Sequence, residues 1–172
     1  MMKYRISKYN PKYRDENGIY TRDEWTSISD IGEYFNGYEV TMKEYSDIEN
    51  RYVEAIDIIL EYFKIKYLYI MELENEENIV NDIDDDFCQN DIDMIDFIKE
   101  GQELNIKEIK YVIRLTLRER FWCGLYSKTT HIIIKPGYDF YINIISPELP
   151  QYIINRINEL GIYLEKINNI CD

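Results

Sequence analysis

His131 is the single histidine of the chain and the first residue to consider for acid–base chemistry. It opens an apolar run, Ile132-Ile133-Ile134, directly after a predicted turn. A general base needs one group that orients it and another that it can deprotonate. The sequence around His131 offers neither, and the chain contains no Gly-x-Ser-x-Gly elbow and no cysteine signature. We therefore predict a protein that is not an enzyme, with His131 at the edge of a strand.

The cysteines do not have the spacing of a zinc site. A zinc site would have to use Cys88, Cys123, Cys171 and His131. Structural zinc ligands come in closely spaced pairs, whereas the nearest two here, Cys123 and His131, stand eight residues apart. An odd number of widely spaced cysteines is also untypical of a disulfide framework and favours reduced thiols in the cytoplasm. The seven glycines are isolated, so no phosphate-binding loop is indicated, and we expect neither metal nor cofactor.

Negative charge is concentrated in one segment. The net charge is −13, and residues 72–108, called here the acidic segment, hold 14 acidic residues against two lysines. Within it, the run from Asp82 to Asp86 begins like a calcium loop. Phe87 occupies the position where that loop needs glycine, so we interpret the run as a solvated loop.

This charge excludes two classes of partner and favours a third. Binding to nucleic acid requires basic residues that displace counterions, and an anionic membrane repels acidic segments. A basic protein is the natural complement. The residues expected to contact it are Asp82, Asp84, Asp85, Asp86, Asp91, Asp93 and Asp96. The alternative is that the segment only keeps the protein soluble.

The first half of the chain contains one strong helix signal. Residues 2–9 alternate like a strand, and a short helical turn is expected at residues 30–35, closed by Asn36-Gly37. Thr41-x-x-Glu44 is a capping box. The apolar stripe behind it, which predicts a helix of about six turns, consists of Tyr45, Ile48, Tyr52, Ile56, Ile59 and Phe63. A strand over residues 67–73 leads into the acidic segment.

The second half predicts further helices and a meander of strands. Asp91 is expected to cap a short helix that ends at Gly101, and Asn105-x-x-Glu108 caps the next. On that second helix, Lys110, Arg114 and Arg118 form a basic stripe, interpreted as a solvated face or as a partner of the acidic segment. Three antiparallel strands are expected at residues 121–126, 130–135 and 138–145. A type II turn at Pro136-Gly137 joins the last two.

The chain should end in a crossover. Ser146-Pro147 predicts the start of a helix that ends at Gly161, and residues 162–167 predict a last strand, parallel to residues 138–145. The expected fold is thus α+β: one domain over residues 1–172, with helices packed against a mixed, largely antiparallel sheet and a C-terminal βαβ crossover. No apolar leader follows Met1, and no run approaches the roughly 20 apolar residues of a membrane span.

Two strings carry a resemblance to a known class of protein. The first is Lys3-Tyr4-Arg5-Ile6-Ser7-Lys8-Tyr9-Asn10-Pro11, then Tyr13-Arg14-Asp15-Glu16-Asn17-Gly18, then Asp23-Glu24-Trp25-Thr26-Ser27-Ile28-Ser29-Asp30-Ile31-Gly32. The second is Arg118-Glu119-Arg120-Phe121-Trp122-Cys123. They resemble small bacterial immunity proteins of polymorphic, contact-dependent toxin systems, most strongly over the first third of the chain.

The resemblance implies a compact, cytoplasmic, non-enzymatic protein that binds and blocks a toxin, typically a nuclease. It assigns no binding residue, because the matching strings are not a chemical motif. Two other hypotheses stand beside it: a small enzyme of unfamiliar type that uses His131 or a carboxylate pair, and a regulatory adaptor for a basic protein. A deep pocket that gathers His131 with two carboxylates would favour the enzyme.

Overall fold

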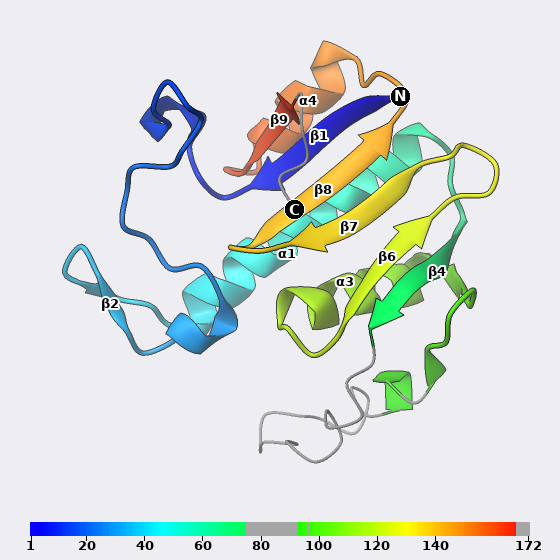
Figure 1. Cartoon of the computed structure of the whole chain (residues 1–172), viewed down its shortest axis with the longest axis horizontal. Coiled ribbons are helices and arrows are strands. Elements are labelled where there is room, and N and C mark those ends of the chain that lie inside the picture. Colours follow the sequence, from blue (N-terminus) through cyan, green and yellow to red (C-terminus); the bar gives the residue numbers. More distant parts are fainter. Residues whose placement is uncertain (75–92, 96, 168–172) are drawn as a thin grey trace.

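The computed structural model describes residues 1–74, 93–95 and 97–167 of the chain. Within these residues, seven strands form one sheet in the order β5-β4-β6-β7-β8-β1-β9, and all neighbouring strands are antiparallel. The strands are β1 (Met2–Ser7), β4 (Tyr67–Glu74), β5 (Glu103–Asn105), β6 (Trp122–Tyr126), β7 (Ile133–Gly137), β8 (Tyr141–Ser146) and β9 (Tyr163–Ile167). Helices α1 (Met42–Tyr62), α3 (Ile106–Leu117) and α4 (Gln151–Asn158) lie on one face of the sheet (Figure 1). The predicted α+β class is confirmed.

Helix α1 begins where the sequence predicted. The Thr41 hydroxyl accepts a hydrogen bond from the Glu44 N–H at 3.2 Å. The Glu44 carboxylate is engaged by a different group, the indole N–H of Trp25 at 3.4 Å, which ties the helix start to the preceding loop. The predicted apolar stripe is buried at Tyr45, Tyr52, Ile56 and Ile59 and half-buried at Ile48 and Phe63. Its burial against the sheet stabilises α1 by more than helix propensity would.

Two tyrosines of α1 lie fully inside the core with their hydroxyls bonded. Tyr45 donates to the carbonyl of Leu117 at the end of α3, and Tyr52 donates to the carbonyl of Phe140, each at 2.8 Å. A buried hydroxyl without a partner would cost about 1–3 kcal/mol, so these bonds make the burial of both rings favourable. Burial raises the pKa of both phenols above its usual value. They fix α1 against α3 and against the hairpin of β7 and β8.

The helical turn predicted at residues 30–35 is wrong. A 3-10 turn, η2, covers Ile28–Asp30, and a separate hairpin of β2 (Tyr34–Phe35) and β3 (Tyr38–Glu39) follows. Asn36 and Gly37 have φ of 52° and 84°, so they form the hairpin turn instead of closing a helix. Asn-Gly is the preferred pair for a type I′ hairpin, whose two central residues need positive φ. The same dipeptide fits both interpretations, and the hairpin is the one that forms.

The predicted meander of β6, β7 and β8 is confirmed, but its second turn lies further along the chain than expected. Pro136 and Gly137 belong to β7, where they pair with Ile142 and Tyr141. A Cβ on Gly137 would lie 2.9 Å from Asn143 Nδ2, so the glycine permits close packing across the hairpin. The chain turns after Tyr138, at two non-glycine residues with positive φ.

The last strand of the C-terminal crossover runs in the predicted direction. Its predicted neighbour in the sheet is wrong. Strand β9 runs in the same direction as β8, but β1 lies between them and pairs with both. Helix α4 begins at Gln151, after Pro150, because Ser146 still belongs to β8 and pairs with Met2. An N-terminal strand can fill the gap of a crossover in this way, which the local pattern of residues 146–167 does not indicate.

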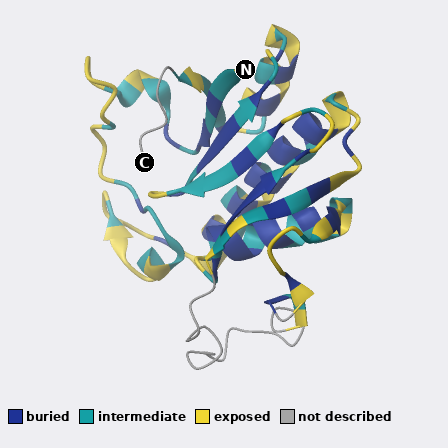
Figure 2. Cartoon of the chain, turned by 45° about the vertical axis from the view of Figure 1, so that its right-hand side comes forward, coloured by how far each residue is buried: buried dark blue, intermediate teal, exposed yellow. Residues whose placement is uncertain are grey.

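One apolar core joins the helices to the sheet, and Figure 2 shows it as the buried band between the two layers. Within the described residues, no helix has the length and apolar character that a membrane span would need.

Candidate protein-binding site

The acidic segment is anchored to the sheet at its base. The chain leaves β4 at Glu74, and the Glu100 carboxylate accepts hydrogen bonds from the backbone N–H groups of Glu72 (3.1 Å) and Leu73 (2.8 Å). The N–H of Gly101 bonds the Ile70 carbonyl at 2.9 Å. These bonds hold both ends of the segment beside β4. The described carboxylates at this base, those of Glu72 and Glu100, therefore have a defined position on the fold.

An open groove lies beside this base. Its volume is about 430 Å³, and it is lined by Asp93, Met94, Phe97, Glu108 and Tyr111. Phe97 is 42% exposed although it is a large apolar residue. The floor is thus apolar and the rim carries carboxylates.

The start of α3 positions one wall of the groove. The Asn105 side chain accepts from the N–H groups of Lys107 (2.9 Å) and Glu108 (3.3 Å), and the Glu108 carboxylate accepts from the Asn105 N–H at 2.7 Å. This confirms the capping box predicted from the sequence. The box uses oxygen Oε2 of Glu108 and holds the carboxylate at the rim. Tyr111 follows one turn later on the same helix face.

The groove has the chemistry to hold a basic side chain. Arginine and lysine pack their methylene stems on apolar surface and keep the charged group in a polar environment. If the methylene stem of an arginine or lysine packed on Met94 and Phe97, its cation would lie near the Glu108 carboxylate. An aromatic ring of the groove would add cation–π attraction to that cation. Charge-assisted hydrogen bonds of this kind are roughly twice as strong as neutral ones.

Of the seven aspartates predicted to contact a partner, the structure places one at this groove. Asp93 is exposed and lines its rim. The other six, which lie outside the described residues, are Asp82, Asp84, Asp85, Asp86, Asp91 and Asp96. The run that begins like a calcium loop lies outside them too, as do Cys88 and Cys171.

The apolar half of the groove was not predicted. Met94 and Phe97 stand outside the Ile92, Ile95, Ile98 pattern that marks the buried side of their helical turn. The one available signal is that a phenylalanine occupies a position where an amphipathic helix would carry a polar residue.

The basic stripe on α3, interpreted above as a solvated face or a partner of the acidic segment, is instead paired with carboxylates of α1 and only partly exposed to solvent. Arg114 and Arg118 both bond the carboxylate of Glu49 on α1, at 2.7 to 2.9 Å. Lys110 bonds Asp57 on α1 at 2.7 Å. Glu49 is buried, with a side chain only 1% exposed. The stripe is therefore a structural link between two helices.

The residues considered for catalysis lie apart. His131 is exposed, has a φ of 58°, and sits in the turn before β7, where its N–H bonds the Ser127 carbonyl. Burial raises the pKa of the Cys123 thiol to about 12, with a smaller contribution from Glu100, so the thiol stays protonated at neutral pH. In the part of the chain that the structure describes, His, Cys, Asp and Glu form no cluster that could hold a metal ion.

Comparisons of the chain with protein-family models, with curated proteins and with solved structures found no match. The function therefore has to be argued from the chemistry of the groove and the charge around it.

Proposed function

We propose that the protein is a cytoplasmic immunity protein, not an enzyme, that binds and neutralises a cognate toxin through the acidic segment and its groove. The observation that carries the proposal is the groove itself. It offers an apolar floor with a carboxylate rim at the anchored base of a segment that contains nearly all of the excess negative charge. Such a surface is suited to a basic protein, since apolar anchors supply binding energy and complementary charge guides association.

A nuclease is the toxin class that this chemistry favours. A nuclease must hold phosphates with basic side chains, so its active surface is positively charged. An acidic inhibitor that covers this surface blocks the substrate directly. Electrostatic steering can raise association rates toward roughly 10⁸–10⁹ M⁻¹s⁻¹ at low salt, which suits an inhibitor that must bind before the toxin acts.

The test uses the product of the neighbouring upstream reading frame as the partner. Association and dissociation rates are measured at about 50 mM and about 500 mM salt, where screening differs strongly. Asp84, Asp85 and Asp86 are changed together to Asn, which removes three charges and conserves shape. We expect slower association with a flatter salt dependence and little change in dissociation. Phe97→Ala should instead speed dissociation, because it removes an anchor from the groove.

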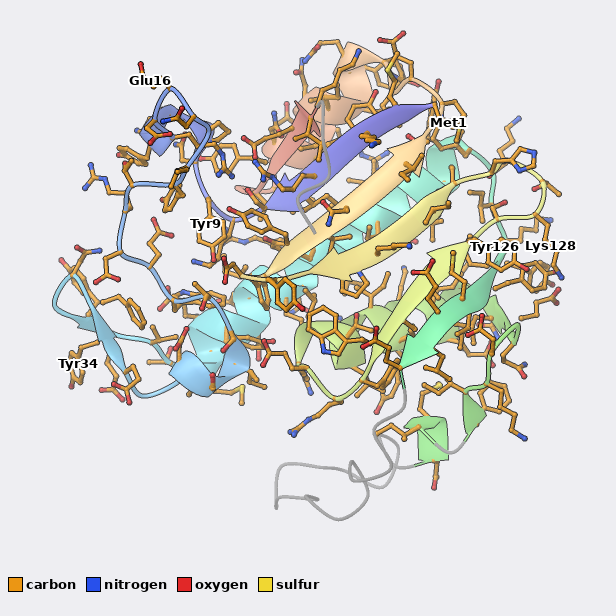
Figure 3. The ribbon with its side chains drawn as sticks, viewed as in Figure 1. Met1, Tyr9, Glu16, Tyr34, Tyr126 and Lys128 are labelled. Carbon is orange, nitrogen blue, oxygen red and sulfur yellow. The ribbon has the colours of Figure 1, made fainter. Side chains whose placement is uncertain are left out.

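Glu16→Gln is the matched control, an exposed carboxylate far from the groove (Figure 3). It should leave both rates unchanged. A growth assay in cells that produce the partner tests neutralisation. Unchanged kinetics in the triple variant and in Phe97→Ala would reject this binding surface. A complex that forms without protecting the cells would reject the immunity role and favour an adaptor.

A further inference from the structure

Strand β4 contains one extra residue near the point where the chain leaves the sheet. Met71 of β4 pairs with Gly124 of β6, and the next recorded pair is Glu74 with Trp122. From one pair to the next, β4 advances three residues and β6 advances two, which defines a β-bulge. With regular pairing, Leu73 would lie opposite Trp122. The bulge therefore gives Trp122 a carboxylate as its neighbour on β4 in place of a leucine.

Hydrogen bonds hold this bulge in place. The Glu100 carboxylate accepts from the backbone N–H groups of Glu72 and Leu73 at 3.1 and 2.8 Å, and Glu72 has a φ of 52°. Residues directly opposite each other on antiparallel strands carry their side chains on the same face of the sheet. The Glu74 side chain therefore lies beside that of Trp122, at the base of the acidic segment.

Trp122 packs in turn on an exposed tyrosine. Its ring centre lies 5.8 Å from that of Tyr138, which directly follows β7. Tyr138 remains 75% exposed despite this contact. Trp122 and Tyr138, called here the aromatic pair, thus continue a row that begins at Glu74. Tryptophan and tyrosine are enriched among the residues that contribute most to binding at protein interfaces.

The carboxylates beside the aromatic pair outnumber the cations that could neutralise them. Glu74 and Asp139 are exposed, and neither forms an ion pair with a residue that the structure describes. Lys135 on the neighbouring strand β7 is already bonded to Glu72. Arg120, which precedes β6, also has a partner within the chain. The local charge therefore favours a basic group over an acidic one.

Two lysines of the sheet that form no ion pair with the described carboxylates lie at the other end of the strands. Lys128 follows the last residue of β6, whereas Trp122 is the first, and a strand of this length spans about 14 Å. Lys3 lies beside Ile145, near the end of β8, whereas the aromatic pair lies before its start. Exposed charges are screened over about 8 Å at physiological salt, so these lysines do not cancel the attraction at the aromatic pair.

We propose that the aromatic pair is a second anchor for the basic partner and that it receives an arginine or lysine side chain. This inference rests on the proposed function. The cation lies over an aromatic ring, where cation–π attraction holds it, and Glu74 and Asp139 supply the opposite charge. The groove lies toward β5 and α3, whereas the pair lies toward β6 and β7, with β4 between them. One partner therefore spans the base of the acidic segment.

The test measures dissociation of the complex with the product of the neighbouring upstream reading frame. Tyr138→Ala should speed dissociation about tenfold and change association little. Tyr138→Phe should dissociate like the wild type, because it keeps the ring. Tyr138→Leu should resemble the alanine variant, because leucine is apolar but offers a cation no π face. Tyr138 is largely exposed, so none of these changes should disturb folding.

Tyr34→Ala is the matched control, since Tyr34 is an exposed tyrosine on the β2–β3 hairpin, away from the base of the acidic segment (Figure 3). It should leave dissociation unchanged. Wild-type dissociation of Tyr138→Ala, in an experiment where Phe97→Ala speeds it, would overturn the second anchor and leave the proposed function intact. Wild-type dissociation of Tyr138→Leu would overturn the assignment of a basic side chain. A partner that does not bind the wild-type chain would overturn the proposed function, and the second anchor with it.

Discussion

Arg118 donates two hydrogen bonds to the carboxylate of Glu49, from Nε to Oε1 at 2.7 Å and from Nη2 to Oε2 at 2.9 Å. Arg114 adds a third from Nη1 at 2.9 Å. The Glu49 side chain is almost fully enclosed, whereas both arginine side chains keep about a third of their surface in water. The pairing is therefore asymmetric: the carboxylate depends on the arginines more than they depend on it.

This asymmetry predicts unequal losses of stability. Changing Arg114 and Arg118 together to Met leaves a buried carboxylate without its cations, which should cost about 3–5 kcal/mol of unfolding free energy. Glu49→Met should cost less, because the two guanidinium groups can turn toward water. Urea unfolding measures both. Lys110→Met serves as the control, since its pair with Asp57 is exposed and should contribute at most about 1 kcal/mol. A larger loss for Glu49→Met than for the double variant would contradict the prediction.

The link between Glu49 and α3 also shows what the sequence can and cannot predict. The basic stripe on α3 and the apolar stripe on α1 were both visible, because each follows the period of a single helix. Their association was not, since Glu49 stands 65 residues before Arg114 and looks like any other surface carboxylate of an acidic chain. Pairings of that range depend on how the helices pack, which no local spacing records.

The same limit applies to β1 and to the groove. The alternation of residues 2–9 predicted a strand, while its place between β8 and β9 follows from the closure of the whole sheet. Asp93 was predicted to contact a partner from the charge of its segment alone. Phe97 and Tyr111, which both line the groove, come from two helical segments that only the fold brings together.

The turn between β7 and β8 contains two non-glycine residues with positive φ, and packing holds the second of them. Asp139 and Phe140 have φ of 55° and 61°, which is unfavourable for a bulky residue. The Phe140 ring packs 5.0 to 5.4 Å from those of Trp25, Tyr45 and Tyr52. We expect Phe140→Gly to destabilise the protein by about 3 kcal/mol, because the lost packing outweighs the relief of strain. Asp139→Gly should be neutral or stabilising by up to about 1 kcal/mol.

Thermal or urea unfolding of the two glycine variants decides between packing and backbone strain as the dominant effect. If Phe140→Gly were as stable as Asp139→Gly, packing of the Phe140 ring would not outweigh the backbone strain, and the explanation of the positive φ at Phe140 would fail.

His131 provides a test of the proposal that the protein is not an enzyme. Its side chain is exposed on a turn, and no carboxylate or cysteine cluster is formed around it in the described residues. We expect His131→Ala to protect cells from the partner as well as the wild type does. His131→Gly should behave in the same way and gain slightly in stability, because glycine adopts a φ of 58° without strain. Loss of protection in a folded variant that still binds its partner would point to catalysis.

Buried tyrosines should make the protein sensitive to alkaline pH. Desolvation by burial raises the pKa of Tyr9, Tyr45 and Tyr52 well above its usual value near 10. Between the unfolded and the folded pKa, the unfolded chain releases phenolic protons that the native state retains. The native state then binds more protons, so stability falls as pH rises above about 10 and is unaffected by these groups below that value.

Absorbance at the phenolate band, followed together with circular dichroism during a pH titration, measures this effect. We expect part of the tyrosine absorbance change to appear only when the helix signal is lost. Tyr45→Phe removes one raised pKa together with its hydrogen bond to Leu117, so it should lower stability at neutral pH while making the decline above pH 10 less steep. Exposed Tyr34 supplies the control, because Tyr34→Phe should change neither quantity. If all tyrosines ionised before the fold was lost, the three buried phenols could not be enclosed as described.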